Sequence, residues 1–286
     1  VQLTFHRCDG STWQKTTLAK GSSYSLPGVR DAEGYTFMGW STKPMQSVSP
    51  QYEAEEKITV NGNVDLYAVV FNRTTETDLT EDQLPQVDIY KYKQVIFVGD
   101  SRTEFMENVL TGMGESATKN VKFVCSAGKG LDWFTTTGWA QLYSIVQHDS
   151  NSILSKKTAV IFNFGVNDLS KSADYAEYYN WIAPQLKSKG CELYFMSVNP
   201  VNRLMLPNAG RADRSEAAVR SFNQYMKANL PSAYTYIDMY SYLKSTGYSF
   251  ASDHYGTGTV DDGLHYTTRT YKRIFAKCMD SLRVPA

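Results

Sequence analysis

The spacing of apolar and polar positions changes near residue 91, and this change divides the chain. From there to the C-terminus, short apolar runs alternate with longer segments in which apolar residues recur at helical spacing. Residues 95–98 are all apolar, which is typical of a strand buried on both faces of a parallel sheet. Further strands are predicted at 121–125, 159–164, 192–198 and 234–238, and helices at 103–110, 139–146, 175–186, 214–230 and 268–282. This alternation predicts an α/β domain with a mostly parallel sheet and helices on both faces.

Residues 1–72 have a different pattern, in which short strands are separated by turn residues. The predicted strands cover 1–5, 16–18, 35–40, 57–60 and 64–70. The last two flank Asn-Gly-Asn at 61–63, and tight hairpin turns favour these residue types, so we expect a hairpin there. A module of about 70 residues can bury only a modest core. We expect the members of this core to be Phe5, Tyr35, Phe37, Trp40, Leu66 and Val70.

A polar segment, residues 73–90, lies between these two parts. It carries five acidic side chains and one basic side chain and is interrupted by Pro85, as is typical of a linker. At 286 residues the chain is longer than most single domains, so two domains are expected. We therefore divide the sequence into a small β-rich domain at 1–72, an acidic linker at 73–90 and an α/β domain at 91–286.

Composition and charge argue against several classes of protein. The 29 basic and 29 acidic side chains balance, and no basic stripe of the kind that binds nucleic acid occurs. There is no run of about 18 apolar residues, so we expect no membrane span. No signal peptide occurs within this numbering and the chain begins at Val1, so we expect a processed product. The four cysteines are far apart and lack C-x-x-C spacing, so neither a zinc site nor a disulfide framework is expected.

Four short polar motifs carry the candidate chemistry. They are Gly-Asp-Ser-Arg at 99–102, Ser-Ala-Gly-Lys-Gly at 126–130, Gly-Val-Asn-Asp at 165–168 and Asp-Gly-Leu-His at 262–265. The first three each follow a predicted strand, and parallel sheets place their sites in the loops at the carboxyl ends of strands. A serine, glycine amides, an asparagine amide and an Asp-His pair are the groups that acyl transfer requires. They supply a nucleophile, donors for the oxyanion and an oriented general base.

Each motif has a structural alternative when it is taken alone. Ser101 could be the N-cap of the helix that follows, a position that serine favours. Asn167 could stabilise its own loop together with Asp168. Gly128 and Gly130 both follow the second strand, and either could supply an oxyanion amide. Gly128 comes first and is preferred, and one of the two is expected to form the turn. The presence of all four motifs in one order favours the catalytic interpretation.

Taken together, the four motifs resemble those of the SGNH (GDSL-type) hydrolase family over residues 91–286. The resemblance implies a three-layer α/β/α fold and a serine hydrolase that needs no cofactor or metal. It assigns the nucleophile to Ser101, the general base to His265 and the carboxylate partner of that base to Asp262. The oxyanion donors would be the Ser101 amide, a glycine amide and the Asn167 side chain. Asp261 is adjacent to Asp262, but its spacing to His265 departs from the family pattern.

Four further residues are weaker candidates for the substrate pocket. Arg102, Trp133 and Asn202 lie beside or soon after predicted strand ends, and His254 is close in sequence to the 262–265 motif. For Trp133, core packing and a wall that faces a sugar are equally good interpretations.

Residues 1–72 resemble the internalin-type β-grasp repeat, or Listeria-Bacteroides repeat, of bacterial surface proteins. The similarity rests on Gly-Tyr-Thr-Phe-Met-Gly-Trp-Ser at 34–41 and on the segment 58–68. Such modules act as spacers, stalks or adhesive units, so the resemblance implies a secreted or cell-surface protein that uses this module for cell-wall or surface association. Trp40 could stack on a sugar, but an aromatic residue beside a glycine in a small β domain is expected in the core.

These interpretations together predict a secreted bacterial serine esterase that hydrolyses small acyl esters. The expected substrate carries O-acetyl groups on a carbohydrate. An acyltransferase or a lipid-directed esterase would use the same residues, and a non-catalytic adhesin would keep the motifs without an open pocket.

Overall fold

The chain forms two compact units in a computed structural model that describes residues 1–88, 91–148, 157–206, 214–251 and 262–282. The N-terminal unit contains Val1–Thr77, Pro200–Ala217 and Tyr240–Thr267, and the α/β unit contains Asp78–Asn199, Ala218–Met239 and Thr268–Ala286. Two segments of the predicted α/β domain therefore pack with the first 77 residues. The division at 1–72, 73–90 and 91–286 stays a prediction about sequence modules.

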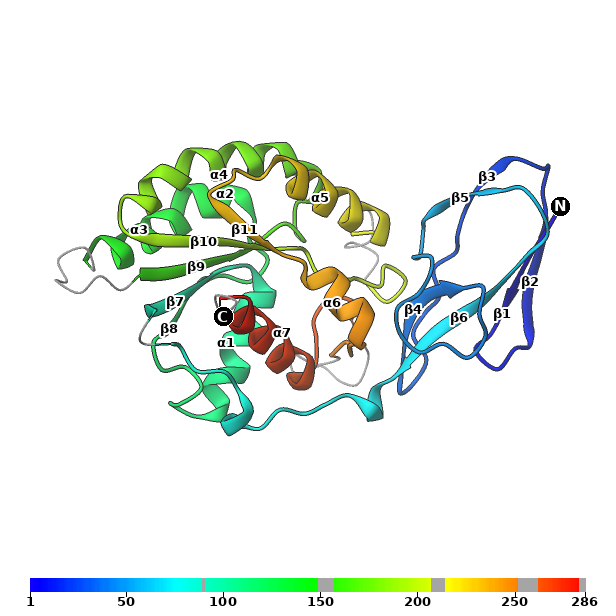
Figure 1. Cartoon of the computed structure of the whole chain (residues 1–286), viewed down its shortest axis with the longest axis horizontal. Helices are drawn as coiled ribbons and strands as arrows, with labels where there is room; N and C mark the ends of the chain where they lie inside the picture. Colours follow the sequence, from blue (N-terminus) through cyan, green and yellow to red (C-terminus); the bar gives the residue numbers. More distant parts are fainter. Residues whose placement is uncertain (89–90, 149–156, 207–213, 252–261, 283–286) are drawn as a thin grey trace. The chain divides into compact units, whose positions relative to one another are not determined.

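A five-stranded parallel sheet forms the centre of the α/β unit, in the order β11-β10-β9-β7-β8 (Figure 1). Its strands are β7 (Tyr92–Gly99), β8 (Val121–Cys125), β9 (Lys157–Asn163), β10 (Cys191–Met196) and β11 (Tyr234–Ile237). Residues 95–98 are fully buried. Strand β7 lies between β8 and β9, so the strand order reverses beside it. In such sheets, ligands bind at this reversal, outside the carboxyl ends of the strands.

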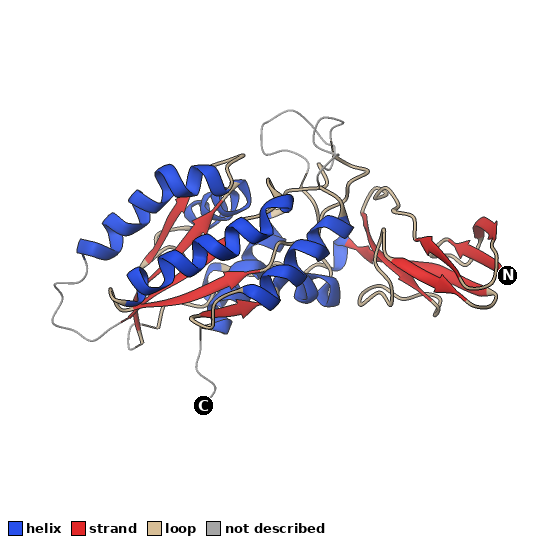
Figure 2. Cartoon of the chain, turned by 90° about the horizontal axis from the view of Figure 1, so that it is seen from above, coloured by secondary structure: helices blue, strands red, loops and turns tan. Residues whose placement is uncertain are grey.

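Helices cover both faces of this sheet (Figures 1 and 2). On one face lie α1 (Ser101–Met113) and α7 (Thr268–Ser281), and on the other α3 (Trp139–His148), α4 (Ser172–Lys187) and α5 (Glu216–Asn229). The Phe275 ring of α7 lies 5.8 Å from the Phe97 ring of β7, and the Tyr175 ring of α4 lies 5.6 Å from the Phe222 ring of α5. The predicted three-layer α/β/α fold with a mostly parallel sheet is confirmed.

The N-terminal unit is built on a four-stranded sheet in the order β2-β1-β6-β4. Its strands are β1 (Gln2–His6), β2 (Thr12–Thr17), β6 (Val64–Asn72) and β4 (Tyr35–Ser41), and β3 (Ser22–Ser25) pairs separately with β5 (Lys57–Val60). Phe5, Phe37, Trp40 and Leu66 are buried in one apolar cluster against this sheet. Trp40 is fully buried and its indole Nε1 donates to the Pro27 carbonyl at 2.8 Å, so its predicted core position is confirmed.

Two predictions about this unit are wrong. Residues 61–63 do not close a hairpin, because β5 pairs with β3 while β6 lies between β1 and β4. The central position buries Leu66 completely, and the Asn63 side-chain oxygen accepts the Gln2 N–H at 2.8 Å, which joins the start of β6 to β1. Tyr35 is 44% exposed rather than in the core, since it begins the edge strand β4.

Two acidic residues near the start of the predicted linker, Glu76 and Asp78, have defined partners. Within the N-terminal unit, the Glu76 carboxylate accepts the Ser249 hydroxyl at 2.5 Å. Within the α/β unit, Asp78 pairs with Lys272 of α7, and this hydrogen bond lowers the pKa of Asp78 below its ordinary value. Glu76 is therefore packed within the N-terminal unit, and Asp78 within the α/β unit.

A buried ion network joins the later segments of the N-terminal unit to its β module. It centres on Lys244 of α6 (Met239–Thr246), a helix that the sequence pattern did not predict. The Lys244 ammonium lies 2.7 Å from the Glu216 carboxylate and 2.8 Å from that of Glu53, and it donates to the Met38 carbonyl at 2.9 Å. Burial disfavours the charge, but the carboxylates outweigh it and hold the pKa of Lys244 well above its ordinary value. The lysine therefore stays charged in the core.

Replacement of Lys244 with alanine is expected to destabilise the N-terminal unit by about 3–5 kcal/mol, because it leaves two buried carboxylates without their cation. Lys15→Ala, at an exposed position of β2, is the matched control and is expected to change stability by less than about 0.5 kcal/mol. Guanidinium unfolding followed by tryptophan fluorescence measures both. Equal effects of the two substitutions would show that the network is not needed.

Candidate active site

The carboxyl ends of three neighbouring strands lie side by side in the α/β unit. Gly99, the last residue of β7, is in register with Cys125 of β8 and with Asn163 of β9. The motifs that contain Ser101, residues 126–130 and residues 165–168 follow directly after these strand ends. The sheet therefore brings three of the four predicted motifs to one edge.

Ser101 is the first residue of α1 and is 4% exposed. The N-cap of this helix is Asp100, whose carboxylate accepts the Arg102 N–H at 3.0 Å. The alternative in which Ser101 is the cap is therefore wrong. Gly99 allows this tight entry, since a Cβ there would lie 2.6 Å from the Asn163 carbonyl oxygen. The N–H groups and dipole of the first helical turn favour negative charge beside Ser101.

Two polar side chains of the first turn of α1 hold the neighbouring loops, and sequence reasoning missed both. Glu104 accepts the Ala127 N–H at 2.6 Å, and Thr103 accepts from the Asn163 side-chain amide at 3.1 Å. Thr103 is fully buried, so its hydroxyl needs such a partner. The signal was present as polar residues on the first turn after Ser101, but their partners are distant in sequence.

The glycine turn after β8 is held by residues that follow β9. Asp168 accepts the Leu131 N–H at 2.8 Å and the Tyr175 hydroxyl at 2.8 Å. Burial raises the pKa of this carboxyl, although these hydrogen bonds oppose the rise. The Asn167 side-chain amide donates to the Lys129 carbonyl at 2.8 Å. The structure therefore brings Asn167 and the two candidate glycines together.

The two glycines of this turn have different surroundings. Gly128 has a φ of +70°, a left-handed conformation that glycine adopts without strain, and no atom lies within 4 Å of where its Cβ would be. Gly130 is packed against Asp168, since a Cβ there would lie 2.7 Å from the Asp168 carboxyl carbon. Gly128 thus forms the turn and Gly130 permits close packing. The assignment of the oxyanion amide to Gly128 or Gly130 stays a prediction.

The fourth motif forms a hydrogen-bonded pair within the N-terminal unit. The His265 Nδ1 lies 2.6 Å from an Asp262 carboxylate oxygen, and the other oxygen accepts the N–H groups of Leu264 and His265, each at 2.8 Å. A carboxylate can only accept, so Nδ1 carries a hydrogen and Nε2 is the ring atom left to act as a base. The His265 side chain is 7% exposed and that of Asp262 is 28% exposed.

The surroundings of Asp262 favour the ionised form of its carboxyl group. Burial by itself would raise the pKa of its carboxyl, but the hydrogen bonds and charge interaction with His265, together with the backbone N–H donors, lower it below the ordinary value of 3.8. A charged Asp262 orients the imidazole ring and stabilises a positive charge on it.

The weaker pocket candidates have varied surroundings. Arg102 is 2% exposed and its guanidinium donates to the Asn199 carbonyl at 3.0 Å. Trp133 is half-buried, with its ring 6.2 Å from that of Phe164. The Asn202 amide donates to Asp31 within the N-terminal unit. His254 and Asp261 lie outside the described residues. A substrate contact for any of these residues stays a prediction.

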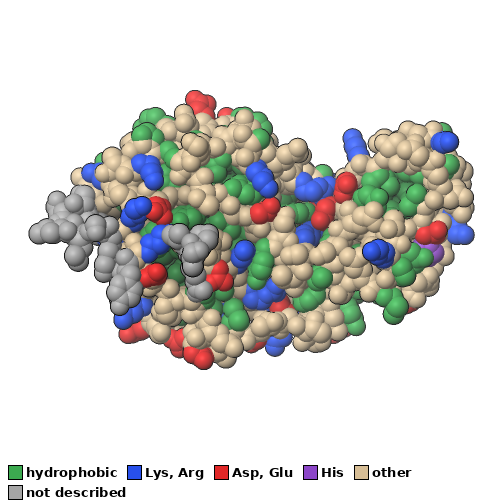
Figure 3. All heavy atoms as spheres, viewed as in Figure 1, with side chains coloured by type: hydrophobic (Ala, Val, Ile, Leu, Met, Phe, Trp, Pro, Cys, Tyr) green, Lys and Arg blue, Asp and Glu red, His purple; other side chains and the backbone are tan. Residues whose placement is uncertain are grey.

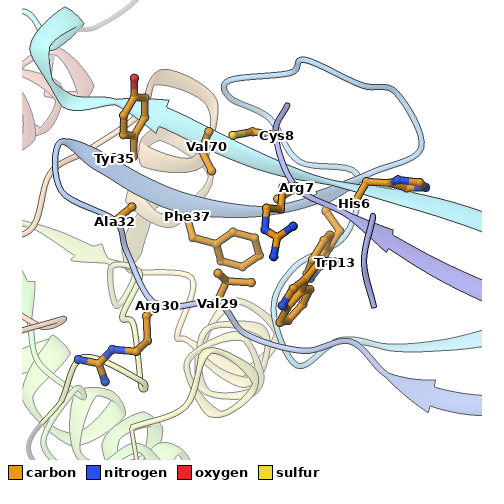
Figure 4. A pocket seen from close by; sticks show the side chains of 12 residues that line it. His6, Arg7, Cys8, Trp13, Val29, Arg30, Ala32, Tyr35, Phe37 and Val70 are labelled. Carbon is orange, nitrogen blue, oxygen red and sulfur yellow. The ribbon is translucent and has the colours of Figure 1, made fainter. Parts of the chain in front are cut away.

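A cavity of about 220 Å³ opens in the N-terminal unit (Figure 4). Its wall includes Phe37, Val70 and Trp13, and Trp13 is 40% exposed and stacks on the buried Trp40 at 5.9 Å between ring centroids. None of the predicted site residues lines this cavity.

Charge and helix lengths add little to the candidate site. On the face drawn in Figure 3, basic and acidic side chains are interspersed. Among the residues that the structure describes, no helix is both long and apolar enough to cross a membrane. In the same ranges, no group of three or more His, Cys, Asp or Glu side chains could hold a metal ion.

Family models match both parts of the chain. The model of the GDSL-like lipase/acylhydrolase family matches residues 95–278, which is more than half of the chain. The chain belongs to this family. The model of the Listeria-Bacteroides repeat domain matches residues 2–69. The GDSL-like match therefore covers the 262–265 motif and the parallel sheet apart from the start of β7. The repeat match covers the four-stranded sheet of the N-terminal unit apart from the end of β6.

Several solved structures are similar in fold to this member of the GDSL-like family. An acylhydrolase structure from Bacteroides fragilis has 16% identity and a TM-score of 0.44, with 70% of this chain and 92% of that chain covered. An acetyl xylan esterase has 10% identity and a TM-score of 0.43, with 66% and 100% covered. The catalytic domain of peptidoglycan O-acetyltransferase A from Streptococcus pneumoniae has 16% identity and a TM-score of 0.38, with 67% and 92% covered. No curated protein matches the chain in sequence.

The lowered pKa of Asp262 predicts an acid-dependent loss of stability. Ionised Asp262 stabilises the fold above the ordinary aspartate pKa of 3.8, and this contribution is lost as the pH falls through the lower value of the folded state. Asp262→Asn should therefore be less stable than the wild type at about pH 7, and the difference should shrink as the pH falls below 3.8.

Urea unfolding at several pH values measures this difference. Asp132→Asn is the control, since the Asp132 side chain is 86% exposed and its ion pair with Lys171 is worth little. A stability difference for Asp262→Asn that does not change with pH would contradict the assignment of a charged Asp262.

Proposed function

We propose that the protein is a serine esterase that hydrolyses small acyl esters through a Ser101-His265-Asp262 triad. The observation that carries this proposal is the polar edge of the parallel sheet. There Ser101 begins α1, and Glu104 and Asn167 hold the adjoining glycine turn. The hydrogen-bonded Asp262 and His265 pair supports the same chemistry, because its geometry leaves Nε2 as the base. Membership in the GDSL-like family supports acyl ester hydrolysis as the reaction class.

In the proposed reaction, the Ser101 oxygen attacks the carbonyl carbon of the ester while His265 Nε2 accepts the serine proton. The charge that develops on the carbonyl oxygen is stabilised by the Ser101 N–H, an amide at position 128 or 130 and the Asn167 side chain. Protonated His265 then donates to the leaving alcohol, which leaves an acyl group on Ser101. Water, activated by the same histidine, releases the acid and restores the serine. Asp262 holds the Nδ1 hydrogen throughout.

The proposed substrates are O-acetyl esters on a carbohydrate, and the proposed location is outside the cell or on its surface. The match of residues 2–69 to the Listeria-Bacteroides repeat supports both, since modules of this kind resemble the spacers and adhesive units of bacterial surface proteins. Acetate release from a panel of acetylated glycans tests the substrate class. Longer acyl esters in the same panel test the lipid-directed alternative, and transfer of acetyl groups to an added sugar acceptor tests the transferase alternative.

Ser101→Ala is expected to abolish both hydrolysis of an activated acetyl ester and labelling by a serine-directed phosphonate, because it removes the attacking oxygen. Ser116→Ala, which changes an exposed serine beyond α1, is expected to keep both. Release of the chromophore and mass spectrometry of the labelled protein measure the two outcomes. Labelling of the Ser101→Ala protein would place the nucleophile elsewhere, and an inert wild type would favour the non-catalytic adhesin.

Asn167→Ala is expected to lower kcat by about 10²–10³-fold with a small change in KM, because an oxyanion donor acts in the transition state. Asn229→Ala is the matched control, since this exposed asparagine lies at the end of α5. Steady-state kinetics on the same acetyl ester measures both. A rise in KM at constant kcat would instead assign Asn167 to ground-state binding.

A further inference from the structure

We propose that the β module of the N-terminal unit positions the catalytic histidine, and that Asp31 and Asn202 are the positioning residues. This inference rests on the proposed role of His265. It assigns a function to residues 1–77 that differs from a spacer or an adhesive unit. One chain of hydrogen bonds connects the 262–265 loop to strand β4 through Asn202 and Asp31.

The loop that contains Asp262 and His265 rests on the turn that begins at Asn202. The Asn202 N–H donates to the Gly263 carbonyl at 2.8 Å, and the turn is closed by the Met205 N–H, which donates to the Asn202 carbonyl at 2.9 Å. Gly263 has a φ of +67°, and a Cβ there would lie 2.7 Å from the Met205 Cβ. Close contact with this turn therefore sets the path of the loop.

The Asn202 side chain is bound in turn by the β module. Its amide nitrogen donates to the Asp31 carboxylate at 2.8 Å and to the Val29 carbonyl at 3.0 Å. Its amide oxygen accepts the Leu204 N–H at 3.2 Å. Both sides of the amide group are thus used, so the orientation of Asn202 is fully determined. An alanine at this position would keep the backbone bond to Gly263 but lose the connection to the module.

Asp31 is itself rigidly held. Its side chain is fully buried, and its carboxylate accepts the Arg73 guanidinium at 2.8 Å and the Phe37 N–H of β4 at 3.0 Å. Arg73 also donates to the Thr36 hydroxyl at 2.9 Å. Figure 4 shows the segment with Val29 and Ala32 running beside Phe37, with the Arg30 side chain directed away from the cavity. The anchor of Asn202 is therefore hydrogen-bonded to the edge strand β4.

A second set of hydrogen bonds holds the other side of the loop. The Ala251 N–H donates to the His265 carbonyl at 2.8 Å, and Thr267 N–H donates to the Ser249 carbonyl at 3.0 Å. The Ser249 hydroxyl in turn donates to Glu76, which is 5% exposed. Residues from the first 77 therefore hold the loop at both flanks. Because a misplacement of about 1 Å can cost about 10²-fold in rate, these contacts are expected to act on kcat.

The test uses the full chain and three readouts. Asn202→Ala and Asn202→Asp are expected to lower kcat by about 10–100-fold with KM changed by less than about twofold. In parallel, the low-field NMR signal that the hydrogen-bonded Nδ1 proton of His265 is expected to give in the wild type should broaden or shift. Arg203→Ala, an exposed neighbour on the same turn, is the control and should match the wild type in both. Circular dichroism checks that each variant is folded.

A double-mutant cycle separates positioning from general damage. It combines Asn202→Ala with Asp31→Ala, because a swap of the amide and the carboxylate would set an amide at position 31 against the Phe37 N–H and a carboxylate at position 202 against the Val29 carbonyl. The loss of kcat in the double variant should be at least about fivefold smaller than the product of the two single losses, a coupling that residues without contact do not show. Additive losses in the double variant would overturn the proposal, as would an Asn202→Ala protein with wild-type kcat and an unchanged imidazole signal.

The NMR signal also separates this inference from the proposed function. If the wild type neither hydrolyses esters nor reacts with the phosphonate, the proposed function fails, yet the imidazole proton still reports the position of His265. Loss of that signal in Asn202→Ala but not in Arg203→Ala would then support the positioning role alone. An unchanged signal in both would overturn it.

Discussion

A parallel sheet that is buried on both faces can carry polar chemistry only where its strands end, and this constraint determines the arrangement of the α/β unit. Residues 95–98 are fully buried and their backbone groups pair with β8 and β9. Ser101, the glycine turn and Asn167 therefore fall into loops at the carboxyl edge, beside the reversal of strand order at β7. The start of α1 at the same edge adds the N–H groups that favour negative charge.

The loops at this edge are held by side chains that come from other segments. Glu104 of α1 binds the backbone after β8, and Asp168 binds the start of the next helix. Asn167 binds the Lys129 carbonyl. Donors that are already oriented need no reorganisation when charge develops, which is why such holding contacts matter for acyl transfer. Several polar groups around the proposed nucleophile thus hold the loops in position and need take no direct part in the reaction.

The Asp262 and His265 pair is also held in place by hydrogen bonds, in this case within the N-terminal unit. Its loop is hydrogen-bonded to Asn202 and Ala251. Asn202 in turn binds Asp31, and Ser249, close to Ala251 in sequence, binds Glu76, so the loop is connected to the first 77 residues on both sides. The GDSL-like family match covers residues 95–278, whereas the compact unit that contains His265 also contains the Listeria-Bacteroides repeat. The repeat is therefore integrated with part of the family domain, which an independent spacer would not require.

The sequence alone determined what depends on local pattern. The apolar run at 95–98, the helical spacing of α4 and α7, and the position of Ser101 after a buried strand led to the fold class and the motifs. Tertiary structure decided the rest. The turn at 61–63 closes no hairpin because β5 pairs with β3, and the roles of Glu104, Asp168 and Asn202 depend on partners far away in sequence. Which strands pair and which buried polar groups meet depends on how whole surfaces are buried. Residue spacing along the chain does not determine this.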